Sequence, residues 1–291
     1  MKGRFRLFDI LFIALLLAGA AWVVYRMRAV LHYKWDWSGA AAYIVRYDES
    51  AQSYVPGLLL YGLGMTVKLS IWASLFASVI GLFMGLMKLS VKPVIRWGAV
   101  LYVGIVRNIP SIVFIFIFYF FISSQITMVL GLDDYFTGLA EYDSILSLFF
   151  SSSSMMTLFI SAVLTLAIYE GAYMTEIVRA GIQSVESGQG EAADALGMSW
   201  LQKMRYIILP QAFKRILPPM AGQIISVIKD SAIVSVISVQ ELTFRGTELM
   251  ASSYRTYEIW IIITLMYFIL TYGCSLAVGS LERYMGRRGY V

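Results

Sequence analysis

Charged residues are scarce in this sequence. Only 14% of its 291 residues are Asp, Glu, Lys or Arg, against the ~25% typical of soluble domains, while 59% are hydrophobic. A soluble fold of this size would need more charge for its surface, so the composition indicates a membrane protein. The net charge of +5 does not indicate nucleic-acid binding, because the basic residues fall in short clusters between long apolar runs.

Cysteine and histidine are nearly absent. The single cysteine, Cys274, excludes a disulfide within the chain, and the single histidine, His32, leaves too few ligands for a His/Cys metal cluster. The sequence also lacks a GxxxxGKS or GxxxxGKT motif, so the chain does not bind ATP through a P-loop. No nucleophile arrangement indicates an enzyme. We therefore expect no catalytic residue, metal or cofactor in this chain.

Long hydrophobic runs, in contrast, are abundant. A helix needs ~20 mostly apolar residues to cross the ~30 Å of hydrocarbon in a bilayer, and six segments meet this requirement. The third is long for one straight span, because Arg107 to Pro110 lie inside it. The sequence predicts an all-α membrane protein with six transmembrane helices, at residues 7–25, 69–87, 97–124, 151–169, 216–240 and 259–281.

The basic residues favour one orientation of these spans. With a cytoplasmic N-terminus, 14 of the 23 Lys and Arg residues fall in inside segments and six in outside segments, so we expect both termini in the cytoplasm. The outside segment 125–150 contains four acidic residues and no Lys or Arg. The first helix has a basic start and small residues at 18–20, as a cleaved signal peptide does. We expect it to stay as an anchor.

The segment from Glu191 to Pro210 is the most informative part of the sequence. Residues 191–196 are rich in alanine and predict a short helix, with Gly197 as its left-handed C-terminal residue. Ser199 and Gln202 have the spacing of a capping box that opens a second helix, which we expect Pro210 to close. An apolar stripe on that helix would face either its own bundle or a partner protein. The stripe consists of Trp200, Leu201, Met204, Ile207 and Ile208.

This segment resembles the signature loop of the permeases of ABC importers. The likeness rests on Glu191-Ala192-Ala193, on Gly197 after three more residues, and on Ile207 and Leu209-Pro210 after a further nine. In that family the loop forms the coupling helices that dock in a cleft of the ATPase subunit. The resemblance implies that Glu191 is the polar contact and Gly197 the turn. The implied ATPase-coupling residues are Glu191, Ala192, Ala193, Gly197, Leu209 and Pro210.

Three further segments resemble the polar amino acid branch of these permeases. They are residues 172–182, the break at 107–110 and the stretch 231–242, and the whole likeness covers roughly residues 60 to 285. The resemblance implies the type I importer permease fold in the bacterial inner membrane. Glu170 departs from the family pattern, where a small or hydroxyl residue is expected, and so does Ala180, where glycine is common.

Charged residues within the spans are costly there and usually face a cavity or a partner. Two roles stay open for them: a substrate pathway, or internal pairing such as Arg107 with Glu176 or Lys229 with an acidic neighbour. Glu170 is the preferred pocket residue, because a carboxylate would bind a substrate ammonium or a cationic side chain. The glycines Gly81 and Gly85 predict close helix packing or a dimer contact. The candidate pathway residues are Arg107, Glu170, Glu176, Lys229 and Asp230.

The sequence thus predicts three parts. These are an N-terminal anchor helix and first outer loop (1–56), a permease core (57–285) with the coupling loop 184–215, and a cytoplasmic tail (286–291). The expected function is alternating-access import of a polar amino acid. The expected partners are a separate ATPase that binds ATP and Mg, a second permease chain that is identical or related, a solute-binding protein and membrane lipid. An ion-coupled secondary amino acid transporter is the alternative.

Overall fold

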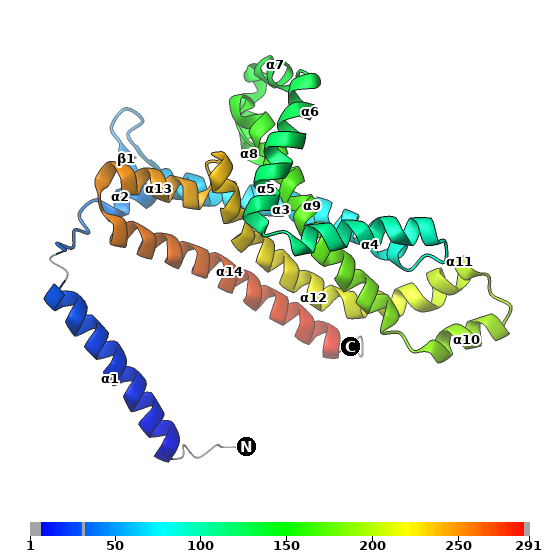
Figure 1. Cartoon of the computed structure of the whole chain (residues 1–291). Coiled ribbons are helices and arrows are strands. Elements are labelled where there is room, and N and C mark those ends of the chain that lie inside the picture. The colour runs from blue at the N-terminus through cyan, green and yellow to red at the C-terminus, as the bar shows by residue number, and fades with distance from the viewer. Residues whose placement is uncertain (1–6, 31–32, 288–291) are drawn as a thin grey trace. The chain divides into compact units, whose positions relative to one another are not determined.

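The computed structural model describes residues 7–30 and 33–287 (Figure 1). The chain forms two compact units, Met1–Ser38 and Gly39–Val291. The first contains helix α1 (Leu7–Val30), whose side chains from Phe8 to Arg26 are all exposed. His32 and the last residues of the expected tail, 288–291, lie outside the described residues.

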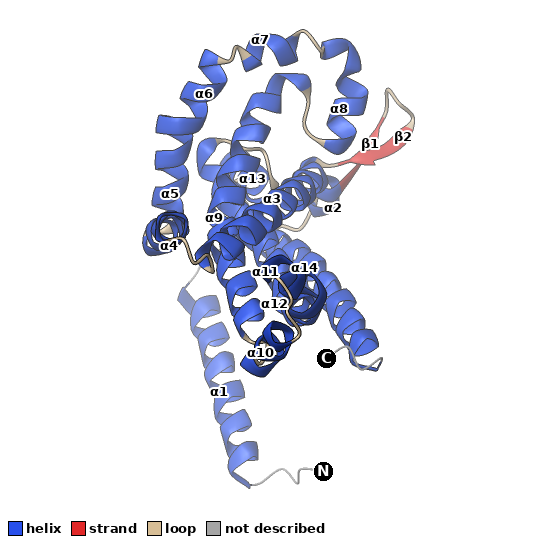
Figure 2. Ribbon diagram, turned by 90° about the vertical axis from the view of Figure 1, so that its right-hand side faces the viewer, coloured by secondary structure: helices blue, strands red, loops and turns tan. Residues whose placement is uncertain are grey.

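The second unit is helical except for one hairpin in its described part, as Figure 2 shows. Strand β1 (Val45–Asp48) pairs antiparallel with β2 (Ser53–Pro56), so that Val45 lies opposite Pro56. The other elements of this unit, in chain order, are α2 (Ala40–Ile44), α3 (Leu58–Lys88), α4 (Pro93–Asn108), α5 (Ser111–Ile117), the π-helix η1 (Phe118–Ser123), α6 (Ser124–Val129), α7 (Leu132–Thr137), the 3-10 helix η2 (Ala140–Tyr142), α8 (Asp143–Phe149), the 3-10 helix η3 (Ser153–Met155), α9 (Met156–Gln183), α10 (Ser187–Ala195), α11 (Trp200–Lys203), the π-helix η4 (Met204–Ile208), α12 (Leu209–Asp230), the 3-10 helix η5 (Ser231–Ile237), α13 (Leu242–Ser253) and α14 (Thr256–Arg287).

Six helical segments of the described chain are long and apolar enough to cross a membrane, which confirms the predicted number. Lipid would cover the exposed apolar side chains of these segments. A polar surface would be costly in the hydrocarbon layer, because no water is available there to form hydrogen bonds with it. The six segments are Phe8–Arg26, Leu58–Lys88, Ser111–Val129, Ser153–Gln183, Trp200–Ile237 and Thr256–Ser280.

The predicted third span, 97–124, is wrong. Helix α4 ends at Asn108, Ile109 is extended with φ −97° and ψ 134°, and a new helix begins after Pro110. The ring of a proline clashes with a helical residue before it, so the break lies where the sequence places Pro110. The second span starts at Leu58 instead of Leu69, because Lys68 does not interrupt helix α3.

Helices α3 and α9 form the centre of the second unit. They run in the same direction, since Gly81 lies against Met174 and Gly85 against Val178. Figure 1 shows α10 and α11 at one end of these helices, and the hairpin, α2 and α13 at the other. The main hydrophobic core lies between them and includes Leu69, Ala73, Ala77, Phe159, Leu166 and Met174.

The two glycines let α3 and α9 approach closely. A Cβ atom at Gly81 would lie 2.6 Å from Cβ of Met174, and one at Gly85 would lie 2.7 Å from Cγ1 of Val178. Both distances are shorter than van der Waals contact, so any side chain would push the helices apart. The prediction of close packing is confirmed. The alternative of a dimer contact is wrong for these glycines, because they face α9 of the same chain.

We expect Gly81→Ala to lower the melting temperature of the purified protein, because overpacking of a well-packed core costs about 1–3 kcal/mol. Gly64→Ala is the matched control on the same helix, since a Cβ atom there meets no heavy atom of the described chain within 4 Å. Melting is monitored in detergent through the fluorescence of a dye that does not react with thiols. If Gly81→Ala melted at or above the temperature of Gly64→Ala, the tight contact between α3 and α9 would be refuted.

Candidate functional site

The segment between α9 and α12 has the predicted helix–glycine–helix form. Helix α10 ends at Ala195, and Gly197 adopts the left-handed conformation with φ +72°. The N–H of Met198 donates to the carbonyl of Ala193 at 3.1 Å, and that of Gly197 donates to the carbonyl of Asp194 at 2.9 Å. These two bonds form a Schellman motif, which accounts for a glycine at this position.

The capping box that opens the second helix is also confirmed. The backbone N–H of Ser199 donates to Oε1 of Gln202 at 2.8 Å, and the N–H of Gln202 donates to Oγ of Ser199 at 3.4 Å. Lys203 then bridges back to α10, with its Nζ 2.7 Å from Oδ1 of Asp194. The turn at Gly197 is therefore fixed by backbone bonds, by a cap and by an ion pair.

The predicted apolar stripe of the second helix divides between the two environments that the sequence left open. Met204 and Ile208 pack against the buried cluster of Val178, Ile182 and Ala212, so this part contacts the chain's own bundle. Trp200 and Leu201 are 63% and 68% exposed. Glu191 and Ala192 of α10 are exposed as well, whereas Ala193 is buried. One face of the loop is thus free to contact a partner.

The expected helix end at Pro210 is wrong. The helix that starts at Trp200 continues through the π-helix η4 into α12, with Pro210 in the first turn of α12. A proline inside an α-helix lacks an N–H group, and its ring meets the carbonyl four residues earlier. The wider π turn directly before Pro210 is the kind of local adjustment that accommodates this. Leu209 is partly buried against the cluster of Val178 and Ala212, and Pro210 is exposed.

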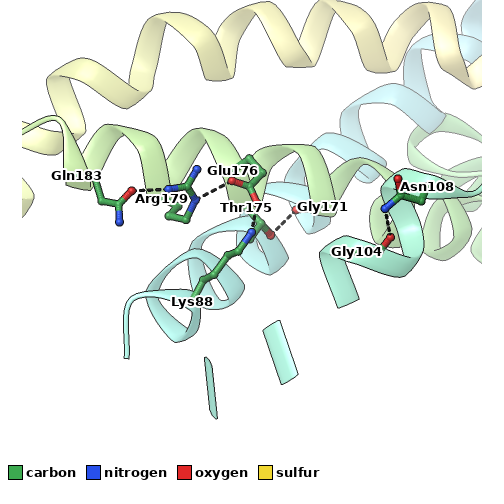
Figure 3. A network of polar contacts seen from close by, with 8 residues as sticks. All are labelled: Lys88, Gly104, Asn108, Gly171, Thr175, Glu176, Arg179 and Gln183. Atoms are coloured by element: carbon green, nitrogen blue, oxygen red, sulfur yellow. Dashed lines mark hydrogen bonds and ion pairs between the residues drawn. The ribbon is translucent and has the colours of Figure 1, made fainter. Parts of the chain in front are cut away.

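A polar network joins the ends of α3 and α9 near the loop (Figure 3). Lys88 of α3 and Arg179 of α9 both form ion pairs with Glu176, and Nε of Arg179 lies 2.7 Å from Oε2 of Glu176. Arg179 also donates to Oε1 of Gln183. The Lys88 and Glu176 side chains are only 17% and 18% exposed. Glu176 thus pairs with Arg179 of its own helix and with Lys88 of α3, and the sequence analysis identified neither contact.

Glu170 is fully buried in the middle of α9. Its Oε2 accepts a hydrogen bond from Nε2 of Gln223 on α12 at 2.7 Å, while its Oε1 has no partner within the described ranges. Asp230, at the end of α12, is close enough to interact with the same carboxylate. A buried carboxylate oxygen without a hydrogen bond is costly, so this site is suited to a further hydrogen-bond donor.

The other two candidates, unlike Glu170, are exposed. Arg107 is exposed, and its guanidinium lies 5.1 Å from the centroid of the Tyr173 ring. The suggested pairing of Arg107 with Glu176 is therefore wrong. Lys229 is exposed, and no ion pair with an acidic neighbour is found for it in residues 33–287.

A second buried carboxylate, Glu241, was missed by the sequence reasoning. It accepts hydrogen bonds from Oη of Tyr267 at 2.7 Å and from the N–H of Phe244 at 2.8 Å, and it also contacts Thr66. Burial raises the pKa of the Glu241 carboxyl group, and the hydrogen bonds it accepts oppose this change. Glu241 ties α3, α13 and α14 together. Glu241 also caps the N-terminus of α13, and this position at the start of a helix was the local feature by which it could have been identified.

Comparisons with known proteins agree with this geometry. The family described as "Binding-protein-dependent transport system inner membrane component" matches residues 77–288. The glutamate/aspartate import permease protein GltK of Escherichia coli O157:H7 is 32% identical over 253 residues, which cover 86% of this chain and 98% of that protein. The probable glutamine ABC transporter permease protein GlnM of Bacillus subtilis is 31% identical over 75% of this chain and 88% of that protein.

Two solved structures are similar in fold. The crystal structure of an amino acid ABC transporter with histidines contains a chain that is 32% identical and has a TM-score of 0.66. The match covers 87% of this chain and 100% of that chain. An inward-facing structure of the MetNI methionine ABC transporter has a TM-score of 0.61 at 18% identity, covers 78% of this chain and is itself covered to 95%. The second likeness concerns the fold alone.

The network in Figure 3 gives a test of side-chain coupling. In a double-mutant cycle of Lys88→Gln and Glu176→Gln, we expect an interaction free energy of about 1–3 kcal/mol from chemical unfolding in detergent, because the pair is largely buried. The same cycle for Lys203 and Asp194, whose carboxylate side chain is 58% exposed, is the control and should give at most ~1 kcal/mol. Equal values for the two pairs would contradict a buried, coupled network.

Proposed function

Because this chain belongs to the family of inner-membrane components of binding-protein-dependent transport systems, we propose that it carries a polar amino acid into the cell. It is a multi-pass inner-membrane permease subunit of an ABC importer. Support for an amino acid as cargo comes from relatives that are named for glutamine, for glutamate and aspartate, and for cystine. The permease itself carries out no covalent chemistry in this proposal.

The observation that carries the proposal is the helix–glycine–helix form of the loop at 187–210. Its exposed face presents Glu191, Ala192 and Trp200, while its other side packs on α9 and α12. A cytoplasmic ATPase subunit docks on that face, with Glu191 as the polar contact and Gly197 as the turn. The small side chain of Ala192 permits close approach of the partner, whereas Ala193 is buried within this chain. Leu209 and Pro210 begin α12 and so join it to the docked element.

ATP and Mg are bound by that partner and not by this chain, which lacks a P-loop sequence. Two permease chains, identical or related, enclose the pathway within the lipid. Closure of the ATPase dimer moves the docked loop, and the pathway opens outward to receive the amino acid from a solute-binding protein. Hydrolysis resets the cycle. In this scheme residues 57–285 are the permease core, 184–215 its coupling loop, 1–56 an anchor helix with the first outer loop, and 286–291 a cytoplasmic tail.

Glu170 is the residue that we assign to the substrate pathway first. Its Oε1 is buried without a partner in the described chain, and Gln223 occupies Oε2. The ammonium group of an amino acid, or a cationic side chain, would supply the missing donors and neutralise the charge. Asp230 lies beside this carboxylate and adds negative charge. Arg107 and Lys229 are exposed in the single chain and are available to the second permease chain, and Glu176 links α3 to α9 next to the coupling loop.

The ion-coupled alternative would use Glu170 or Asp230 as a proton or cation site. Nothing in the comparisons supports it, because the relatives are permease proteins of binding-protein-dependent or ABC systems. The two mechanisms differ in their energy source. ATP dependence of uptake therefore separates them.

We expect ATP-dependent uptake in proteoliposomes that contain this chain, its ATPase and its binding protein. Glu191→Arg should abolish the accumulation of radiolabelled glutamine, glutamate and cystine, because a reversed charge removes the polar contact of the coupling loop. Glu186→Arg, an exposed charge reversal in the same loop just before α10, should retain uptake. Uptake by the wild type without ATP, or uptake unaffected by Glu191→Arg, would refute the coupling role.

Glu170→Gln tests the pathway. We expect the KM of uptake to rise by about tenfold or more, since a hydrogen bond to a charged group contributes about 1.5–3 kcal/mol. The control is Glu241→Gln, which alters another fully buried carboxylate, one that lies in a structural junction. It should lower the melting temperature and leave KM unchanged. A KM that is the same for Glu170→Gln and the wild type would remove Glu170 from the pathway.

A further inference from the structure

A cavity of about 260 Å³ lies beside the N-terminal parts of α3 and α9, whereas α10 and α11 follow the C-terminal end of α9. Its lining residues come from the first half of α3, the end of α8, the segment that leads into α9, the start of α9, and the region around the start of α13. Its size is below the ~300–1,000 Å³ of pockets for drug-sized ligands, so it suits a smaller molecule. Its polar lining comprises Tyr61, Lys68, Ser147, Ser151, Ser152, Gln240 and Arg245.

The lining of this cavity carries positive charge only. Lys68 and Arg245 are both among the lining residues, whereas no Asp or Glu is. The Nζ of Lys68 donates to the carbonyl oxygen of Ser147 at 2.5 Å, and no carboxylate pairs with it within the described chain. A charged side chain within an apolar span normally faces a partner or a cavity. Lys68 faces this cavity and keeps an unneutralised charge.

Arg245 contributes a donor that is not in use. Its NH1 pairs with Glu248 at 2.7 Å and its NH2 donates to Oε1 of Gln240 at 2.6 Å. Its Nε is buried and has no hydrogen-bond partner among the described residues. Buried donors are nearly always satisfied in folded proteins, so the open Nε is an unusual feature of a residue that lines a cavity. The two bonds to Glu248 and Gln240 also hold the guanidinium in place.

We propose that this cavity binds the carboxylate group of the translocated amino acid at the extracytoplasmic entrance. The inference rests on the proposed function, which makes α10 and α11 cytoplasmic and the opposite end external. Lys68 supplies the counter-charge, and Arg245 and the serine residues supply hydrogen-bond donors. Met155, Leu158 and Phe159 give the cavity an apolar side for the rest of the ligand.

This entrance site is separate from the one assigned to Glu170. Leu158 of the cavity and Glu170 lie twelve positions apart on α9, a rise of about 18 Å along the helix axis. The outer site is cationic and takes the carboxylate, whereas the inner site is anionic and takes the ammonium. An amino acid would therefore be held first by one end and then by the other on its way through the permease.

The test measures binding and docking separately in the complex of permease and ATPase in nanodiscs. Free glutamine, glutamate and cystine are titrated without binding protein, and the corresponding carboxamides, which lack the α-carboxylate, are titrated in parallel. Docking of the solute-binding protein is measured by surface plasmon resonance. The variants are Lys68→Gln with Arg245→Gln, the charge-conserving Lys68→Arg, and the control Arg46→Gln, an exposed arginine on the hairpin at the same end.

We expect the double variant to weaken binding of the preferred amino acid about tenfold or more, because it removes charge-assisted bonds. Lys68→Arg and Arg46→Gln should bind as the wild type does, the carboxamide should not compete, and docking should be unchanged. Retained melting temperature and retained ATPase in the purified complex exclude misfolding of the double variant.

Two results would overturn the proposal. If docking weakened while free amino acid bound normally, the carboxylate would belong to an acidic side chain of the binding protein. If neither changed, the cavity would bind no carboxylate. A wild type that binds amino acid but shows no ATP-dependent uptake would instead refute the proposed function, so the two failures are distinguishable.

Discussion

The contact between α3 and α9 is the constraint on which the rest of this permease depends. It exists because Gly81 and Gly85 present no side chains to Met174 and Val178. The hydrophobic effect gives helices little tendency to associate within lipid. Close van der Waals contact must therefore supply the free energy of association. Once the two helices touch, Lys88 comes within reach of Glu176, and the remaining helices can pack around a fixed pair.

The buried polar groups show a division of tasks within an apolar bundle. Glu241 receives hydrogen bonds from three elements and serves as a structural junction. Glu170 receives one from Gln223 and has an oxygen left over. Both are completely inaccessible in this structure, so burial alone does not distinguish them. The number of hydrogen bonds that each carboxylate accepts does distinguish them. For this reason we propose that Glu170 contacts substrate and that Glu241 stabilises the fold.

Local features of the fold were predictable from the sequence, and features that depend on distant residues were not. Gly197 and the Ser199–Gln202 box are determined by neighbours within four positions, and both were predicted correctly. The end of the helix at Pro210 was predicted wrongly, because packing of Met204 and Ile208 on α9 keeps the helix continuous through a π turn. The start of the second span was placed too late, since the charge of Lys68 ended the apolar run although the cavity accommodates it.

The shared direction of α3 and α9 has an electrostatic consequence. Peptide dipoles in each helix sum to partial negative charge at the C-terminal end, so two parallel helices bring like charges together. The chain places cations at that end: Lys88 in the last turn of α3, Arg179 in the last turns of α9, and Arg215, which donates to the carbonyl of Ser184 at the α9 cap. The abundance of basic residues on this side of the membrane thus compensates the macrodipoles of the two central helices.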